Sequence, residues 1–330
     1  DRPESRPPVP PLPEKRFRIA ATRDQEQLVQ RLVRFGLGRR RRPLIVTADR
    51  GRGKSAAMGM AAAELLRQGR QDIVVTAPSE QNVETLFRHA RESLGDELAE
   101  ASPGILASRT GGRLRFIPVR DLLALRPEAE VVLVDEAAAI PAPLLKSVLL
   151  GWPRVAFATT VHGYEGAGRG FAIRFRQVLD QSTPQWQSVT LSEPVRWSMN
   201  DPLEALISRL FLLAADGGRL PGKTEYSAGE LVIEPWEPAT ASDEALSRAF
   251  GLLVDAHYRT SPADLRQWLD DTAARSWRAR IGDQMVGVLW CALEGGLPDE
   301  LAQQVSLGTR RIRGHLLPQS LASHSGYPEA

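Results

Sequence analysis

The chain has 330 residues, of which 42% are hydrophobic and 25% charged, and its formal net charge is +2 at pH 7. This length suggests about two domains, and the hydrophobic content excludes a chain that is disordered overall. The small net charge is not that of a strongly basic nucleic-acid binder, and one cysteine, Cys291, excludes an internal disulfide and a cysteine-based zinc site. No apolar run has spanning length and no apolar signal region opens the chain, which indicates a cytoplasmic protein.

The amino-terminal part divides into a linker and a helix. Six prolines fall among the first thirteen residues, so residues 1–16 are interpreted as an extended proline-rich linker. Residues 21–37 fit an amphipathic helix that Thr22 caps and Gly38 ends. Gln25 lies at the start of this helix, where helicase-like ATPases place a glutamine that reads the adenine edge. An ordinary surface glutamine is the alternative.

Residues 43–60 (PLIVTADRGRGKSAAMGM) have the layout of a phosphate-binding P-loop, namely a buried strand, a glycine-containing turn and a helix. Gly51 and Gly53 let backbone N–H groups turn toward an anion, and the helix N-terminus adds partial positive charge. Lys54 is expected to reach the β- and γ-phosphates and Ser55 to ligate Mg²⁺. The first glycine of the strict pattern is an alanine. A Gly/Arg-rich turn before an amphipathic helix is the alternative interpretation.

The run at residues 131–136 (VVLVDE) combines a strand with two carboxylates. Four apolar residues in a row are typical of a strand buried on both faces of a parallel sheet. The carboxylates follow at its carboxyl end, where α/β sheets place their ligands. We expect Asp135 to hold Mg²⁺ and Glu136 to orient or deprotonate the attacking water. A strand that ends in a solvated acidic turn is the alternative.

Three further features lie between this strand and a boundary at residues 216–222. Residues 154–160 read as another strand, and the glycine-rich stretch at 161–175 reads as a flexible loop able to sense hydrolysis, or as a plain surface loop. Arg196 is a candidate arginine finger, although packing beside Trp197 explains it equally well. Two arginine clusters, at positions 39–42 and 310–313, suit either phosphate binding or a solvated basic turn.

The carboxyl-terminal segment has a different pattern. A strand at residues 230–236, helices at 242–258 and 262–269, and a hairpin over 276–292 predict an α+β domain. A helix near residues 298–305 and a loop-rich basic tail complete the chain.

Several long motifs together resemble the RNA cytidine acetyltransferase family. They are ADRGRGKSAAMGM, LVDEAAAIPAPLL, ATTVHGYEGAGRGFAIRF, SEPVRW and RRIRGHLLPQSLASH. The resemblance runs from about Arg18 to the end of the chain. It implies a RecA-like P-loop NTPase fold, α/β with a parallel sheet and helices on both faces, followed by a GNAT-type α+β domain.

The resemblance also implies an activity. Family members acetylate N4 of a cytidine with acetyl-CoA and ATP hydrolysis, in bacteria the wobble cytidine of elongator tRNA(Met). Asp135 and Glu136 match the acidic pair of the family. The implied nucleotide-binding residues are Gln25, Gly51, Arg52, Gly53, Lys54, Ser55, Ala56, Ala57, Met58, Gly59, Met60 and Arg196.

The resemblance divides the chain into three parts: the linker (1–16), a helicase-like ATPase domain (17–216) and the first part of a GNAT domain (229–330). The glycine-containing basic loop that holds acetyl-CoA in GNAT folds is not found in the last of these, so we expect the chain to be a fragment that lacks this cofactor site. A P-loop RNA helicase or translocase with an RNA-binding C-terminal domain, and a nucleotide switch without chemistry on RNA, are the competing functions.

Overall fold

The computed structural model describes residues 20–160, 168–218, 228–256, 262–312 and 314–324. Contacts group the chain into two compact units, Asp1–Ala215 with Val254–Ser261, and Asp216–Leu253 with Pro262–Ala330. Among the described residues, no helix is long and apolar enough to cross a membrane.

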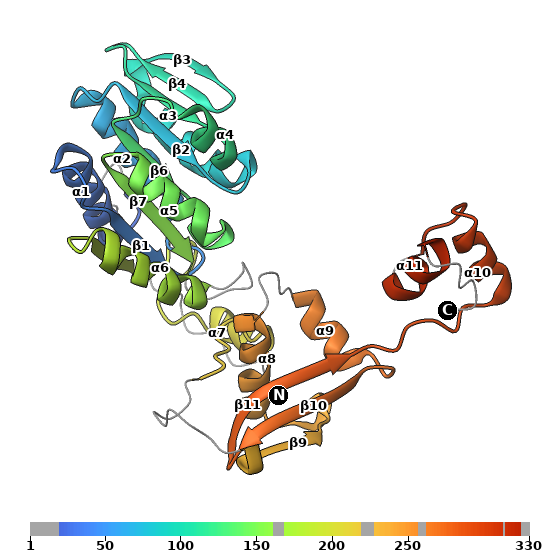
Figure 1. Ribbon diagram of the computed structural model, residues 1–330. Helices are drawn as coiled ribbons and strands as arrows, with labels where there is room; N and C mark the ends of the chain where they lie inside the picture. Colours follow the sequence, from blue (N-terminus) through green and yellow to red (C-terminus); the bar gives the residue numbers. More distant parts are fainter. Residues whose placement is uncertain (1–19, 161–167, 219–227, 257–261, 313, 325–330) are drawn as a thin grey trace, which may run out of the picture. The chain divides into compact units, whose positions relative to one another are not determined.

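The first unit is built on an eight-stranded sheet with the order β3-β4-β5-β2-β6-β7-β1-β8 (Figure 1). In this order, neighbouring strands are parallel from β5 through β2, β6, β7 and β1 to β8. Strands β3 and β4 form an antiparallel extension at the β5 edge. The strands are β1 (Leu44–Ala48), β2 (Asp72–Thr76), β3 (Leu98–Ser102), β4 (Ile105–Ser108), β5 (Arg113–Phe116), β6 (Val131–Val134), β7 (Val155–Thr160) and β8 (Gln187–Leu191).

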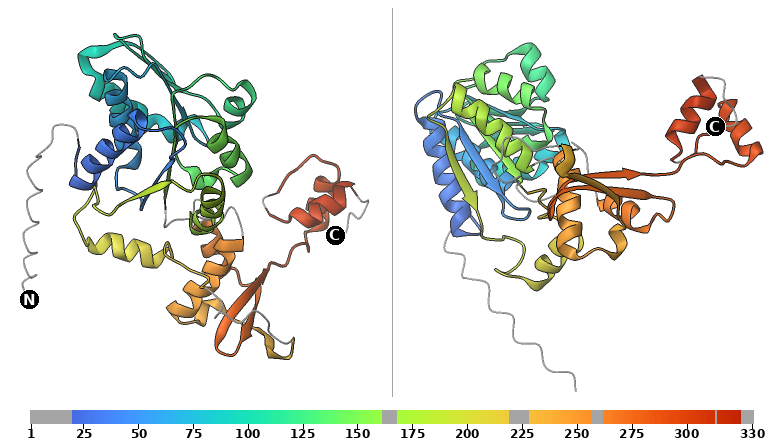
Figure 2. Two further views of the ribbon diagram at one scale, coloured as in Figure 1. Left: turned by 60° about the vertical axis from the view of Figure 1, so that its left-hand side comes forward. Right: turned by 60° about the horizontal axis from the view of Figure 1, so that its bottom comes forward.

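Helices cover both faces of this sheet, as the left view of Figure 2 shows. Residues of α1, α2 and α3 share one buried cluster with one face, and residues of α4, α5 and α6 share another with the opposite face. Neighbouring residues of a strand alternate between the clusters: Val131 and Leu133 belong to the first, Val132 and Val134 to the second. The helices are α1 (Arg23–Leu37), α2 (Lys54–Arg67), α3 (Glu84–Leu94), α4 (Val119–Leu125), α5 (Ala142–Gly151), α6 (Gly168–Ser182) and α7 (Pro202–Leu210).

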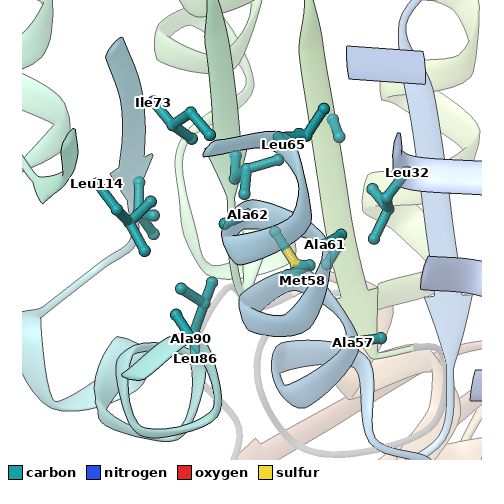
Figure 3. Packing of buried hydrophobic residues seen from close by; sticks show 14 of the residues in the cluster. Leu32, Ala57, Met58, Ala61, Ala62, Leu65, Ile73, Leu86, Ala90 and Leu114 are labelled. Carbon is teal, nitrogen blue, oxygen red and sulfur yellow. The ribbon is translucent and has the colours of Figure 1, made fainter. Parts of the chain in front are cut away.

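Helix α2, which follows the P-loop, is deeply buried. Its alanines, leucines and methionines are buried on nearly all sides, because α1, α3 and the sheet all pack against it (Figure 3). Gly59 permits the close approach of α3, because a Cβ there would lie 2.1 Å from the backbone oxygen of Leu86. Neighbours on several sides therefore fix the position of α2, whose first turn follows the P-loop.

The second unit holds the antiparallel sheet β11-β10-β9, with β9 (Leu231–Pro235), β10 (Arg275–Ile281) and β11 (Gln284–Cys291). The predicted strand, two helices and hairpin are all present, the helices being α8 (Asp243–Ala256) and α9 (Pro262–Asp270). Trp268 anchors the core: its ring lies near those of Trp236, Phe250 and Trp290, and its Nε1 donates to Ser276 Oγ at 2.8 Å. Helix α10 (Asp299–Ser306) follows.

Three sequence predictions are wrong in detail. The glycine-rich stretch is not a loop through residue 175, because α6 already begins at Gly168; residues 161–167 lie outside the described part. The pattern of residues 201–215, with Pro202 in the first turn, predicts a helix to residue 215, whereas α7 ends at Leu210, since Leu212 turns the chain with a φ of +48°. The basic tail contains a helix, α11 (Leu316–His324), whose proline falls in the first turn, where a missing N–H breaks no hydrogen bond.

Candidate nucleotide-binding site

The P-loop joins the carboxyl end of β1 to the N-terminus of α2. Gly51 and Gly53 have φ values of +76° and +80°, a left-handed conformation that glycine adopts without strain. Because β6, β7 and β1 are adjacent and parallel, their carboxyl ends meet at one edge of the sheet. Asp135 follows β6 and Thr160 ends β7, so both lie at the same edge as the P-loop.

Lys54 is buried at this edge, with 7% of its surface exposed. Its Nζ donates to Thr160 Oγ1 at 3.0 Å, and that hydroxyl donates to Glu136 Oε2 at 3.4 Å. Burial lowers the pKa of Lys54, while Glu136, Asp135 and Asp49 raise it again by their negative charge. The lysine thus reaches across the loop toward the acidic pair, and its contact with nucleotide phosphates stays a prediction.

Asp135 is fully buried, and its two carboxylate oxygens differ. Oδ1 accepts the backbone N–H of Glu136 at 2.9 Å, and the side chain is also hydrogen-bonded to Ser55. Oδ2 has no hydrogen-bond partner among the described residues. Burial is the main reason that the pKa of Asp135 rises to about 6, with the charge of Glu136 adding to the rise. A buried, unpartnered carboxylate oxygen beside a hydroxyl suits a hard cation such as Mg²⁺.

No cluster of three or more His, Cys, Asp or Glu residues able to hold a metal occurs in the described part of the chain. A cation between Ser55 and Asp135 therefore needs further oxygen ligands from elsewhere. Mg²⁺ commonly takes them from water and from the phosphates of a nucleotide, which matches a P-loop site.

Gln25 lies at the P-loop, but its amide is already engaged by backbone groups. Its Oε1 accepts from Ala21 N at 2.7 Å and its Nε2 donates to Gly53 O at 3.1 Å. Only 2% of the residue is exposed. In this conformation Gln25 supports the shape of the loop, and recognition of adenine by it stays a prediction.

The segment after β8, together with α7, closes on the outer side of the P-loop. Arg52 Nη1 pairs with Glu204 Oε1 at 2.6 Å, and Glu204 Oε2 accepts from Trp197 Nε1 at 2.6 Å. The Trp197 ring lies under the Arg52 guanidinium and against Gly51, where an added Cβ would be 2.5 Å from the ring. Val195 N donates to Gly51 O at 2.9 Å.

These contacts fix the P-loop from outside, and sequence reasoning missed Glu204. No local signal identifies it, since it is 152 residues from its partner Arg52. Arg196 lies in the same closing segment and is exposed, without a hydrogen bond or ion pair to any described residue. Its role as an arginine finger stays a prediction.

The remaining predicted contact residues belong to the first two turns of α2. The structure packs Ala57 and Met58 into the core and Gly59 against α3, while Ala56 and Met60 are also buried. Packing alone accounts for these five residues. The residues that face the acidic edge or shape the loop are Gly51, Arg52, Gly53, Lys54 and Ser55.

The parallel sheet, the P-loop and the acidic pair define the class: a helicase-type P-loop ATPase fold. The chain belongs to the RNA cytidine acetyltransferase family, because residues 45–214 match the family model described as RNA cytidine acetyltransferase NAT10/TcmA, helicase domain.

Curated relatives agree with this family. The chain is 44% identical over 311 residues to tRNA(Met) cytidine acetyltransferase TmcA of Nitrosococcus halophilus, covering 94% of this chain and 41% of the relative. It is 39% identical over 335 residues to the protein of the same name from Vibrio cholerae, covering 98% of this chain and 46% of that relative. The chain thus spans less than half the length of these relatives.

Solved structures give only distant likenesses. The large terminase of a thermophilic bacteriophage matches with a TM-score of 0.43 and 12% identity, over 58% of this chain and 50% of the terminase. The Pif1 helicase from Candida albicans matches with a TM-score of 0.36 and 15% identity, over 61% of this chain and 45% of the helicase. At these scores the likenesses carry no weight for function.

Proposed function

We propose that this chain carries the ATPase module of a tRNA(Met) cytidine acetyltransferase, which forms N4-acetylcytidine at the wobble position of elongator tRNA(Met). In this proposal residues 17–216 bind and hydrolyse ATP with Mg²⁺, residues 229–330 contribute the first part of a GNAT-type acetyltransferase domain, and acetyl-CoA is the acetyl donor. The names of the relatives and the family match support the substrate and the reaction.

The observation that carries the ATPase proposal is the meeting of Lys54, Thr160, Glu136 and Asp135 at the carboxyl edge of the sheet. The backbone N–H groups of the loop and of the first turn of α2 bind the phosphates. Lys54 neutralises the charge of the transferred phosphoryl group, as phosphoryl transfer requires.

Ser55 and Asp135 hold the cation, which neutralises charge on the phosphates when it is bound. Glu136, one residue beyond Asp135, is proposed to orient or deprotonate the attacking water. Its hydrogen bond from Thr160 links it to Lys54, so the base and the phosphate-binding lysine keep a fixed relation. These roles of Asp135 and Glu136 require no further carboxylate at this edge of the sheet.

Hydrolysis serves acetylation if it brings the cytidine to the acetyl donor. A wobble cytidine belongs to a stacked anticodon loop, and extruding a base from its stack costs a few kcal/mol. ATP hydrolysis supplies far more than this, so an ATPase module coupled to RNA remodelling is a reasonable partner for acetyl transfer.

The test is acetyl transfer by full-length protein that contains this chain, incubated with elongator tRNA(Met), acetyl-CoA, Mg²⁺ and ATP. Nucleoside mass spectrometry is expected to detect N4-acetylcytidine, with much less product when ATP is omitted. A transcript with uridine at the wobble position is the matched control and should give none. ATP hydrolysis without any acetylated product would instead favour the competing function, an RNA helicase or translocase.

A further inference from the structure

A cluster of arginines on the first unit plays no part in the nucleotide site. Six of the twelve residues from position 31 to position 42 are arginines: Arg31, Arg34, Arg39, Arg40, Arg41 and Arg42. Five of the six are exposed, and none makes an ion pair with another described residue. Unpaired like charges at this density repel one another, so the cluster is a strong local source of positive potential.

Four of these arginines line one groove. Arg31 and Arg34 come from the carboxyl half of α1, and Arg39 and Arg42 from the turn that leads into β1. The groove has a volume of about 280 Å³, and Phe35 supplies an apolar wall. None of the described residues that line it carries a carboxylate, and Gln187 of β8 supplies a neutral polar side chain.

The turn that presents the arginines is held in place by the protein. Arg41 adopts a φ of +59° and its N–H donates to Pro153 O at 2.7 Å. Arg154 Nε donates to Gly38 O at 2.9 Å, and Arg42 Nε donates to Gln185 Oε1 at 2.8 Å. The groove is therefore a built surface rather than a loose basic loop.

The charges beside the groove also favour the binding of an anion. The pKa of Arg154 is lowered, first by burial and then by the like charges of Arg70 and Arg40; Glu130 opposes this shift. Arg70 pairs with Glu130 at 2.7 Å, so that carboxylate is already committed. An anion that enters the groove meets positive charge without a competing carboxylate.

The groove and the P-loop lie at opposite ends of the same elements. Leu44 starts β1 beside Gln187, at the groove, whereas Ala48 ends β1 at the P-loop. The four residue steps from Leu44 to Ala48 separate these two ends by roughly 13 Å along the strand. The first turn of α1 contains Gln25, which bonds to the P-loop, while its last two turns line the groove. A ligand in the groove therefore does not compete with a nucleotide for space.

We propose that this groove binds the phosphodiester backbone of RNA, with Arg31, Arg34, Arg39 and Arg42 as the phosphate ligands. The arginine fork matches phosphate oxygens, and four guanidiniums around one groove suit a repeating polyanion better than a single small anion. The proposal deepens the function proposed above and rests on it, since it assigns part of the RNA-binding surface of that enzyme.

Fluorescence anisotropy of a fluorescein-labelled tRNA transcript, without nucleotide, tests the proposal. The dissociation constant is measured from about 50 to 300 mM KCl, because each phosphate contact adds about 0.7 to 0.9 to the slope of log K against log salt. We expect R34Q/R39Q/R42Q to weaken binding at least about tenfold near 150 mM salt and to reduce the slope by about 2 to 3. R34K/R39K/R42K keeps the charge and should keep most of the slope.

The triple variant R88Q/R91Q/R109Q removes three exposed arginines elsewhere on the first unit and is the charge-matched control. It should bind RNA nearly as wild type does, and melting curves should show all variants folded. Equal loss in both glutamine variants would overturn the proposal, as would displacement of the transcript by millimolar inorganic phosphate. If wild type binds RNA and the groove variant binds it equally well, the groove is not the RNA-binding surface, but the proposed function still stands. If wild type binds no RNA, both the groove proposal and the proposed RNA-modifying function are wrong.

Discussion

Replacing Lys54 with alanine is expected to abolish ATP hydrolysis. The ammonium group lies at the carboxyl edge of the sheet, 3.0 Å from Thr160 Oγ1, and the other lysine among the described residues, Lys146, is exposed. Loss of a preorganised positive group at a phosphoryl-transfer site costs a factor of about 10² to 10³ in turnover. Phosphate release at saturating ATP measures the effect.

Lys146→Ala is the matched control, because Lys146 is an exposed residue of α5 and is not among the residues proposed to bind nucleotide. Its turnover should equal that of wild type. Melting curves of both variants show whether they are folded. If folded Lys54→Ala protein kept more than about a tenth of wild-type turnover, the P-loop would not be the hydrolytic site.

Replacing Asp135 with asparagine is expected to reduce activity and raise stability together. Activity should fall by about a hundredfold or more, because the variant removes the charge proposed to hold the cation, an interaction worth several kcal/mol in the transition state. Stability should rise at neutral pH, because the substitution removes a buried carboxylate with one unpartnered oxygen. A trade-off of this kind is common at functional sites.

The stability difference between Asp135→Asn and wild type should increase as the pH rises. The pKa of Asp135 is raised from 3.8 to about 6 in the folded chain, so the folded state binds this proton more tightly than the unfolded state does. Wild type therefore loses stability as pH rises from about 4 to about 6, by an amount on the order of 2 to 3 kcal/mol. The Asp135→Asn variant has no carboxyl group to ionise at this position, so it does not lose this stability.

Thermal melting in EDTA measures the difference. At a pH of about 7.5 the variant should melt about 5 to 10 °C above wild type, and at a pH of about 4.5 the gap should be much smaller. Added Mg²⁺ and ATP should stabilise wild type more than the variant, since only wild type keeps the charged ligand. A gap that is the same at both pH values would show that the ionisation of Asp135 does not cause it.

The core of the fold and the acidic edge could be predicted because parallel strands buried on both faces are continuous apolar runs. Strands β1, β6 and β7 all have this character, and their order along the chain with a P-loop predicts the α/β class. The positions of Lys54 and Asp135 follow from the same logic, since ligands gather at the carboxyl ends of such strands.

The antiparallel extension could not be predicted in the same way. Strand β3 is mostly exposed on both faces, so its sequence shows no alternation of apolar and polar residues. It exists because it pairs with β4, and β4 pairs with β5, which is a non-local effect. The intrinsic preference of a sequence for the β-strand conformation is weak, so pairing with neighbouring strands decides whether a strand forms.

The outer support of the P-loop was also beyond prediction from the sequence. Glu204 stands in the first turn of α7, where an acidic residue is ordinary, and only the folded chain brings it to Arg52 and Trp197. Met58 shows what the sequence leaves open in the other direction. The family resemblance implies a nucleotide contact there, which stays a prediction, and its side chain packs in the core between α2 and its neighbours (Figure 3).

A crystal structure of the chain with Mg²⁺ and a non-hydrolysable ATP analogue tests most directly whether the carboxyl edge of this sheet is an ATP site. The triphosphate should lie against the backbone from Gly51 to Ser55, with Lys54 at the terminal phosphates and the metal between Ser55 and Asp135. Nucleotide bound elsewhere on the chain, or a metal remote from Asp135, would contradict the proposed site.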